Sequence, residues 1–168
     1  MNRAVFLDRD GTINVDKGYL YKKKEFEFIP GAIEAIKMLN DNDYLVIVIT
    51  NQSGVARGYY SEPDVINLHN FINRELNKYH AYVDKFYYCP HHQEGIGRYK
   101  RKCKCRKPDI GMIEQAVKEF NIDKSQSYMI GNEDSDIKAG INAGLKRSFK
   151  VTSSLNLLQI VKGIIHER

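Results

Sequence analysis

Short apolar runs alternate with amphipathic stretches along the whole chain. The strand-like runs lie at 4–7, 45–49, 83–89, 128–130 and 149–151. Between them, apolar residues recur three or four positions apart, as Ile33, Ile36 and Leu39 do after Pro30-Gly31. This periodicity predicts helices over 30–39, 61–79, 109–120 and 136–143, and a last stretch over 155–165 that covers the sheet. Strands joined by crossover helices predict an α/β fold, a Rossmann-like three-layer sandwich around a mainly parallel sheet.

Length and composition narrow the class of protein. A chain of 168 residues suits one domain, 1–168, and its 42% apolar and 28% charged residues are ordinary for a soluble globule. We find no apolar run near the ~20 residues that cross a bilayer and no export leader, so we expect a cytoplasmic protein without a membrane partner. The net charge of +5 fits nucleic acid or an anionic phosphate substrate equally well.

Polar clusters follow three of the predicted strands. The first contains Asp8 and Asp10, the second runs from Thr50 to Ser53, and the third spans 132–136. Ligands of open parallel sheets bind beyond the carboxyl ends of the strands, so we expect these clusters to converge on one site. Two carboxylates held this close repel each other unless a cation lies between them or one is protonated.

These clusters also carry a family resemblance. Asp8-x-Asp10-Gly11-Thr12, Thr50-Asn51, Lys107 and Gly131-Asn132-x-x-x-Asp136 resemble the four motifs of the haloacid dehalogenase-like phosphohydrolases. Within that superfamily, 50–58, 89–92 and 103–108 resemble the D-glycero-D-manno-heptose 1,7-bisphosphate phosphatases. The resemblance implies removal of the 7-phosphate to leave heptose 1-phosphate, in the synthesis of nucleotide-activated heptose for surface glycans.

Other functions stay open at this point. Histidinol-phosphate phosphatases, which act in histidine biosynthesis, carry very similar segments and are the leading alternative. A nucleic-acid end phosphatase would use the positive charge, and a non-catalytic relative would follow from weakened metal binding. We expect a small-molecule sugar bisphosphate as the substrate, no nucleic-acid partner, and a monomer.

The chemistry of phosphate ester hydrolysis suggests a role for each motif residue. Asp8 is the expected nucleophile, which would form an aspartyl-phosphate. Asp10 would first protonate the leaving sugar oxygen and then take a proton from the attacking water. Thr50 and Lys107 would hold the phosphoryl oxygens and offset their charge.

Magnesium is the implied catalytic metal, because it prefers hard oxygen ligands. We expect the Asp8 carboxylate, the Asp10 backbone carbonyl and Asn132 to bind it, with Glu133 or Asp136 as further ligands. The family pattern has an Asp where this chain has Asn132. An amide oxygen brings no charge, so this departure predicts weaker magnesium binding.

The three cysteines of the chain point to a second metal. Cys89 and His91 are followed by Cys103 and Cys105, which gives three thiolates and an imidazole, a set typical of structural zinc. An odd cysteine count and a cytoplasmic setting disfavour a disulfide. The expected zinc would order the loop insertion 89–105 and position the adjacent Lys107.

Candidate substrate contacts lie on both sides of the motifs. Arg106 would bind the second phosphate of a bisphosphate through its planar guanidinium. The remaining candidates are Asp16, Lys17, Gly18, Tyr19, Asn51, Gln52 and Ser53. The gaps between the motifs are filled by predicted sheet and helices, so we expect no large cap domain and a zinc loop that forms the main wall of the site.

Overall fold

The computed structural model describes residues 1–167 and contains a sheet of five parallel strands in the order β3-β2-β1-β4-β5. The strands are β1 (Arg3–Leu7), β2 (Tyr44–Asn51), β3 (Lys85–Cys89), β4 (Tyr128–Gly131) and β5 (Arg147–Lys150). Leu7 of β1 lies opposite both Val48 of β2 and Ile130 of β4. The chain after β1 therefore emerges between its two neighbours, where the strand order reverses.

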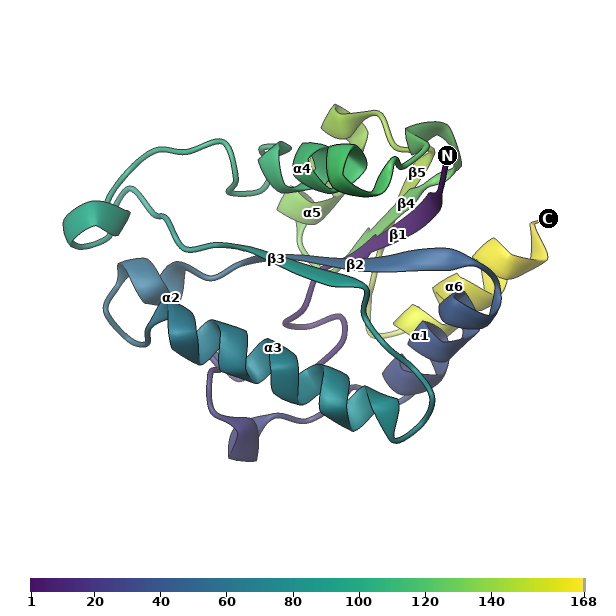
Figure 1. The fold of residues 1–168 in the computed structure, drawn as a ribbon, viewed down its shortest axis with the longest axis horizontal. Coiled ribbons are helices and arrows are strands. Elements are labelled where there is room, and N and C mark those ends of the chain that lie inside the picture. Colours follow the sequence, from purple (N-terminus) through teal and green to yellow (C-terminus); the bar gives the residue numbers. More distant parts are fainter. Residues whose placement is uncertain (168) are drawn as a thin grey trace.

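Helices cover both faces of the sheet (Figure 1). One face carries α1 (Ala32–Asp41), α3 (Glu62–Asn77) and α6 (Leu157–His166), and the other carries α4 (Gly111–Phe120) and α5 (Asp134–Ala143). Because successive side chains of a strand point to opposite faces, Val5 and Leu7 pack with the first group and Ala4 and Phe6 with the second. The predicted three-layer α/β sandwich is confirmed.

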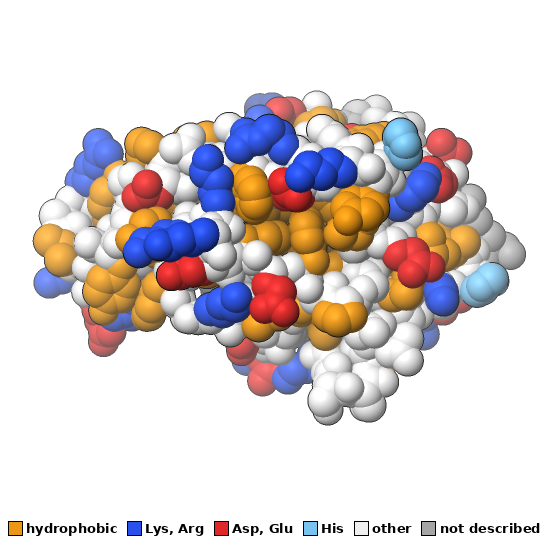
Figure 2. Space-filling model, turned by 90° about the horizontal axis from the view of Figure 1, so that it is seen from below, with side chains coloured by type: hydrophobic (Ala, Val, Ile, Leu, Met, Phe, Trp, Pro, Cys, Tyr) orange, Lys and Arg blue, Asp and Glu red, His pale blue; other side chains and the backbone are white. Residues whose placement is uncertain are grey.

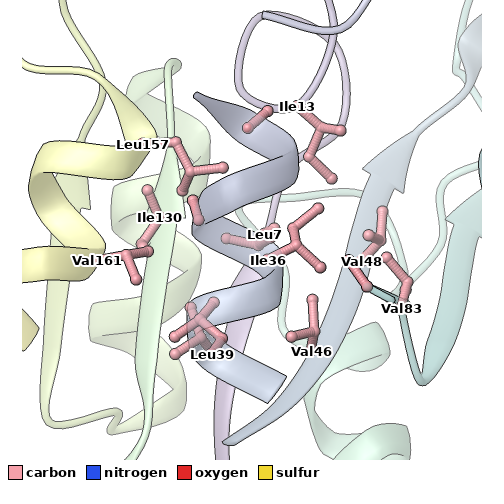
Figure 3. Packing of buried hydrophobic residues seen from close by; sticks show 14 of the residues in the cluster. Leu7, Ile13, Ile36, Leu39, Val46, Val48, Val83, Ile130, Leu157 and Val161 are labelled. Carbon is pink, nitrogen blue, oxygen red and sulfur yellow. The ribbon is translucent and has the colours of Figure 1, made fainter. Parts of the chain in front are cut away.

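The larger core lies between the sheet and α1 (Figure 3). Ile36 and Leu39, one helical turn apart on α1, face Val46 and Val48 of β2 and are fully buried. Val161 of α6 closes the core from the other side of α1. Burying each of these side chains contributes about 1.5–3 kcal/mol, which fixes the strands whose ends carry the polar clusters.

Capping residues determine where α3 and α5 begin. Ser61 accepts a hydrogen bond from the Asp64 amide at 3.2 Å and the Asp64 carboxylate accepts one from the Ser61 amide at 2.9 Å, so a capping box begins α3 at the predicted helix start. A second box between Glu133 and Asp136 starts α5 at Asp134, two residues before the predicted start. The four-residue helix α2 (Ser53–Ala56) was not predicted, because it is too short to show a periodicity.

Three short 3-10 helices complete the elements, η1 (Lys23–Glu25), η2 (Gly97–Tyr99) and η3 (Lys124–Gln126). The loop 89–105, which contains η2, extends beyond α2 at the left of Figure 1. Its η2 is tied back to the body, because Tyr99 and Tyr88 each donate a hydrogen bond of 2.7 Å to Glu62 at the start of α3. Within residues 1–167 no segment folds into a separate cap.

Charge is mixed on the face that lies below in Figure 1. Figure 2 shows Lys and Arg side chains interspersed with Asp and Glu on this face, around a central group of apolar side chains. Neutralising a nucleic-acid backbone needs a continuous basic surface, which this face does not present. Among the described helices, none combines the length and apolar character needed to cross a membrane.

Candidate active site

The ends of β1, β2 and β4 bring the sequence clusters together. Asp8 follows β1 directly, and its amide donates to the Ile130 carbonyl of β4 at 3.0 Å. Thr50 lies near the end of β2, and Asp136 lies in the first turn of α5. All three side chains line, with Lys107, a cavity of about 260 Å³, so the expected convergence on one site is observed.

Lys107 is the electrostatic centre of this site. Its Nζ donates to Asp8 Oδ1 at 2.8 Å, to Asp136 Oδ1 at 2.7 Å and to the Ile49 carbonyl at 2.8 Å. An ammonium has three protons, so each is used. Asn51 fixes the backbone of this lysine, because its Oδ1 accepts from the Lys107 amide at 3.0 Å and its Nδ2 donates to the Lys107 carbonyl at 3.3 Å.

Burial shifts the titration of these groups. Burial raises the pKa of Asp8 to about 6, although the neighbouring Lys107 opposes this rise. Burial alone would lower the pKa of Lys107, but the carboxylates of Asp8 and Asp136 together raise it above its ordinary value. Two buried carboxylates thus share one ammonium, and the excess negative charge favours binding of a cation.

Asp10 is held by donors on every side. Its Oδ1 accepts from Arg9 Nε and Nη2 at 3.1 and 3.0 Å and from Asn14 Nδ2 at 3.0 Å. Its Oδ2 accepts from Arg9 Nη2 at 3.1 Å and from Gln52 Nε2 at 3.2 Å. The carboxylate therefore has a fixed orientation, and its side chain is still 24% exposed toward the cavity.

Gln52 links this carboxylate to Thr50 and Tyr60. It accepts from the Tyr60 hydroxyl at 2.5 Å and donates to Thr50 Oγ1 at 2.9 Å. Since Thr50 is the acceptor in that bond, its own hydroxyl proton remains available to a ligand. Gln52 is 2% exposed and is among the residues that line the cavity, so its role as a substrate contact stays a prediction.

The residues present fit a magnesium ion. One terminal atom of the Asn132 amide lies 3.0 Å from Asp8 Oδ2 and 3.1 Å from the Asp10 carbonyl oxygen. With oxygen at that position, its distance to each of these two oxygens is about the spacing of neighbouring ligands around octahedral Mg²⁺, whose bonds are ~2.0–2.1 Å. With nitrogen there, the amide donates hydrogen bonds to the same two oxygens.

The two further ligands considered from the sequence have other partners. Both carboxylate oxygens of Asp136 are engaged, one by Lys107 and the other by the Glu133 amide at 3.0 Å. The Glu133 side chain caps α5 at the Asp136 amide. Asp136 therefore acts as the partner of Lys107, and Glu133 lines the cavity near its rim.

The predicted substrate contacts divide between two cavities. The 260 Å³ cavity is lined by Asp16, Gly18, Tyr19, Asn51, Gln52 and Ser53. Lys17 instead points away and donates to the Glu25 carbonyl at 2.7 Å. Arg106 lines a neighbouring cavity of about 320 Å³. Lys107 lines both cavities, so they adjoin at this residue.

The cysteine cluster forms at the base of the loop 89–105. Candidate ligand atoms of Cys89, His91, Cys103 and Cys105 all lie within 4.8 Å of one another. Cys89 and Cys105 are joined as a disulfide, the pairing that the sequence analysis disfavoured, and Cys103 keeps a free thiol. His91 Nδ1 lies 3.4 Å from Cys105 Sγ, and Cys103 Sγ lies 3.4 Å from Cys89 Sγ.

Sequence reasoning missed four residues that organise the site, Arg9, Asn14, Tyr60 and His69. Arg9 is fully buried despite its charge, and His69 on α3 lies 3.1 Å from it. The one available signal was a basic residue placed between two aspartates directly after an apolar strand. Tyr60 and His69 gave no signal, because they reach the site from segments outside the motifs.

Comparison with known proteins agrees with this geometry. Residues 104–153 match the family model described as "HAD-hyrolase-like". The D-glycero-beta-D-manno-heptose-1,7-bisphosphate 7-phosphatase of Haemophilus influenzae is 48% identical over 151 residues, which cover 90% of this chain and 82% of that protein. The D-glycero-alpha-D-manno-heptose-1,7-bisphosphate 7-phosphatase of Campylobacter jejuni is 45% identical and covers 85% of this chain and 78% of that protein.

A solved structure gives the same result. The D,D-heptose 1,7-bisphosphate phosphatase of B. bronchiseptica, complexed with magnesium and phosphate, superimposes with a TM-score of 0.85 at 25% identity, and the match covers 99% of each chain. Both the sequence and the fold of this chain are thus similar to those of heptose bisphosphate phosphatases. The chain belongs to the heptose-1,7-bisphosphate 7-phosphatase family of haloacid dehalogenase-like hydrolases.

Proposed function

We propose that this protein is a magnesium-dependent phosphatase that removes the 7-phosphate of D-glycero-D-manno-heptose 1,7-bisphosphate. The observation that carries this proposal is the buried Asp8 carboxylate, which faces the cavity beside Lys107 while Asp10 lies two residues on with a fixed orientation. This pair offers a nucleophile and an acid on one cavity wall. Relatives above 40% identity bear this activity in their names.

In the first step, Asp8 attacks phosphorus and forms an aspartyl-phosphate while the bond to the sugar oxygen breaks. Asp10 gives its proton to that leaving oxygen. When Asp8 forms its bond to phosphorus, the Lys107 proton that it accepted at 2.8 Å becomes available to a phosphoryl oxygen. This ammonium and the free hydroxyl proton of Thr50 hold the phosphoryl oxygens and offset their growing charge.

In the second step, Asp10 takes a proton from water, which attacks the aspartyl-phosphate and releases phosphate from Asp8. The oxygens of Asp8, Asp10 and Asn132 described above would hold magnesium. When bound, the ion supplies positive charge that screens the phosphate oxygens from the incoming carboxylate. Asn132 contributes no charge of its own to that set.

The adjoining cavity fits the second phosphate of the bisphosphate. Burial lowers the pKa of Arg106, and its Nη1 is buried with no hydrogen-bond partner among the described residues. A phosphate in this cavity would satisfy the Arg106 guanidinium. Histidinol phosphate carries one phosphate and would leave that guanidinium unpaired, so this cavity favours the bisphosphate.

A structural zinc completes the proposal. A disulfide between Cys89 and Cys105 gives no reason for His91 and Cys103 to face the same point, whereas zinc in the reduced protein would use all four ligands. Reduced thiols imply the cytoplasm, the compartment in which we place the enzyme. Zinc would order the loop 89–105 next to Arg106, and we propose that the enzyme works as a monomer of one domain.

The substrate is tested by phosphate release from both anomers of heptose 1,7-bisphosphate and from histidinol phosphate, with magnesium titrated. Asp8→Asn serves as the blank, because it keeps the shape of the side chain and removes the nucleophilic charge. A preference for one bisphosphate anomer of at least about tenfold supports the proposal. A preference for histidinol phosphate, or release that survives Asp8→Asn, overturns it.

Zinc is tested by metal analysis of protein purified under reducing conditions. We expect one equivalent of zinc, and its loss in Cys103→Ser, which removes a thiolate that the disulfide does not use. Lys102→Ser is the matched control on the neighbouring exposed residue. Zinc-free protein that keeps an unreactive Cys89–Cys105 pair under reductant would contradict the assignment.

A further inference from the structure

The fully buried guanidinium of Arg9 joins three parts of the site. Its Nε and Nη2 grip the Asp10 carboxylate, and Nη2 also donates to the Leu20 carbonyl at 3.0 Å. Leu20 ends the segment whose residues Asp16 and Tyr19 line the cavity. Burying an arginine costs several kcal/mol unless its charge and donors are satisfied, so these contacts are not incidental to the fold.

His69 holds the remaining side of this guanidinium. It comes from α3, is 4% exposed, and its Nε2 lies 3.1 Å from Arg9 Nη1. Burial first, and the nearby Arg9 charge second, lower the pKa of His69 well below its ordinary value. The imidazole is therefore neutral, and Nε2 is the acceptor for the Arg9 donor. Phe86 of β3 stacks on the ring at 4.4 Å and fixes its plane.

We infer that Arg9 and His69 are positioning residues that orient Asp10 for proton transfer. Three donor contacts meet Asp10 Oδ1 and two meet Oδ2, so the carboxylate has more free acceptor capacity at Oδ2. Oδ2 is thus the atom that carries the proton to the leaving oxygen. Without His69, the Arg9 guanidinium can rotate, and Asp10 Oδ2 is no longer held in one orientation.

This inference rests on the proposed function, in which Asp10 is the acid. Substrates that differ in their leaving group distinguish a failure of the positioning role from a failure of the proposed function. A sugar alkoxide leaves only with a proton, whereas p-nitrophenolate leaves without one. The value of kcat/KM reports the steps up to the release of the leaving group. A defect in positioning the acid therefore lowers kcat/KM for the heptose bisphosphate and spares that for p-nitrophenyl phosphate, whereas a general loss of folded enzyme lowers both.

The test compares four variants on both substrates. Asp10→Asn should lower kcat/KM for the bisphosphate by about 10²–10⁴-fold and that for the aryl phosphate much less. His69→Leu leaves Arg9 without its acceptor and should show the same selectivity with a loss of about 10–100-fold. His69→Gln restores an acceptor oxygen and should recover to within about threefold of wild type.

The fourth variant, Ile72→Ala, separates positioning from stability. Ile72 is fully buried one turn further along α3, so its truncation destabilises the same helix without contacting Arg9. Ile72→Ala should lower kcat/KM for the bisphosphate and for the aryl phosphate by the same factor, or leave both unchanged. If Asp10→Asn shows no leaving-group selectivity, the acid role falls and the inference with it. If Asp10→Asn is selective while His69→Leu behaves like Ile72→Ala, the positioning role alone is overturned.

Discussion

Asn132→Asp would raise magnesium affinity and lower the stability of the metal-free protein. A carboxylate oxygen in place of the amide would lie about 3.0 Å from Asp8 Oδ2. At an effective dielectric constant of 20, two unit charges at that separation repel by ~5–6 kcal/mol. Asp8 has a pKa raised to about 6, so protonating it at pH 7 costs only ~1.4 kcal/mol, which sets the upper limit of the destabilisation by repulsion.

Loss of the amide hydrogen bonds acts in the same direction. We therefore expect the metal-free variant to lose about 1–3 kcal/mol of stability, or roughly 2–12 °C in Tm for a chain of this size. With magnesium bound, the same carboxylate adds a charged ligand. The affinity for Mg²⁺ should rise at least about tenfold, which corresponds to ~1.4 kcal/mol.

The assay is thermal unfolding in a chelator and across a magnesium titration, with Kd for Mg²⁺ measured by calorimetry. Glu133→Gln is the matched control, because it removes a charge at the next residue, whose side chain caps α5. It should change Kd by less than about threefold. A metal-free Asn132→Asp protein that melts at or above the wild-type temperature would refute the repulsion reasoning. An unchanged Kd would show that residue 132 is not a ligand.

Two further predictions concern buried charge. Because the folded pKa of His69 is lowered, protonation favours the unfolded chain, so stability is full above pH 6.5 and falls by up to about 1.4 kcal/mol per pH unit below it. Denaturant unfolding at pH 7 and pH 5 should show this one-proton loss in wild type and not in His69→Gln. Lys107→Met leaves Asp8 and Asp136 unpaired, so it should abolish phosphate release and cost about 3–5 kcal/mol, measured by urea unfolding. Wild-type stability in Lys107→Met would contradict the buried network.

The sheet and its chemistry were predictable because local patterns encode them. Apolar runs located all five strands, and Asp8, Thr50 and Asp136 follow from where three of those strands end. The parallel order of the sheet then brings these residues together without further information. Lys107 was predicted from its motif, yet its three contacts depend on β1, β2 and α5 at once.

Other parts depend on contacts that no local pattern encodes. Arg9 meets His69 across 60 positions of sequence, and Tyr60 donates to Gln52 from the far side of α2. Lys17 leaves the cavity because the Glu25 carbonyl lies within its reach. The pairing of Cys89 with Cys105 depends on where the loop 89–105 returns to the sheet.

The two hydrogen bonds between the Asn51 side chain and the Lys107 backbone affect which parts of the site can vary within the family. The lysine follows the loop 89–105 in sequence, so changes in that loop would ordinarily displace it. Asn51 instead ties the lysine backbone to β2, next to Thr50, at both the amide and the carbonyl. The loop can therefore change in length and composition while Lys107 keeps its place beside the sheet.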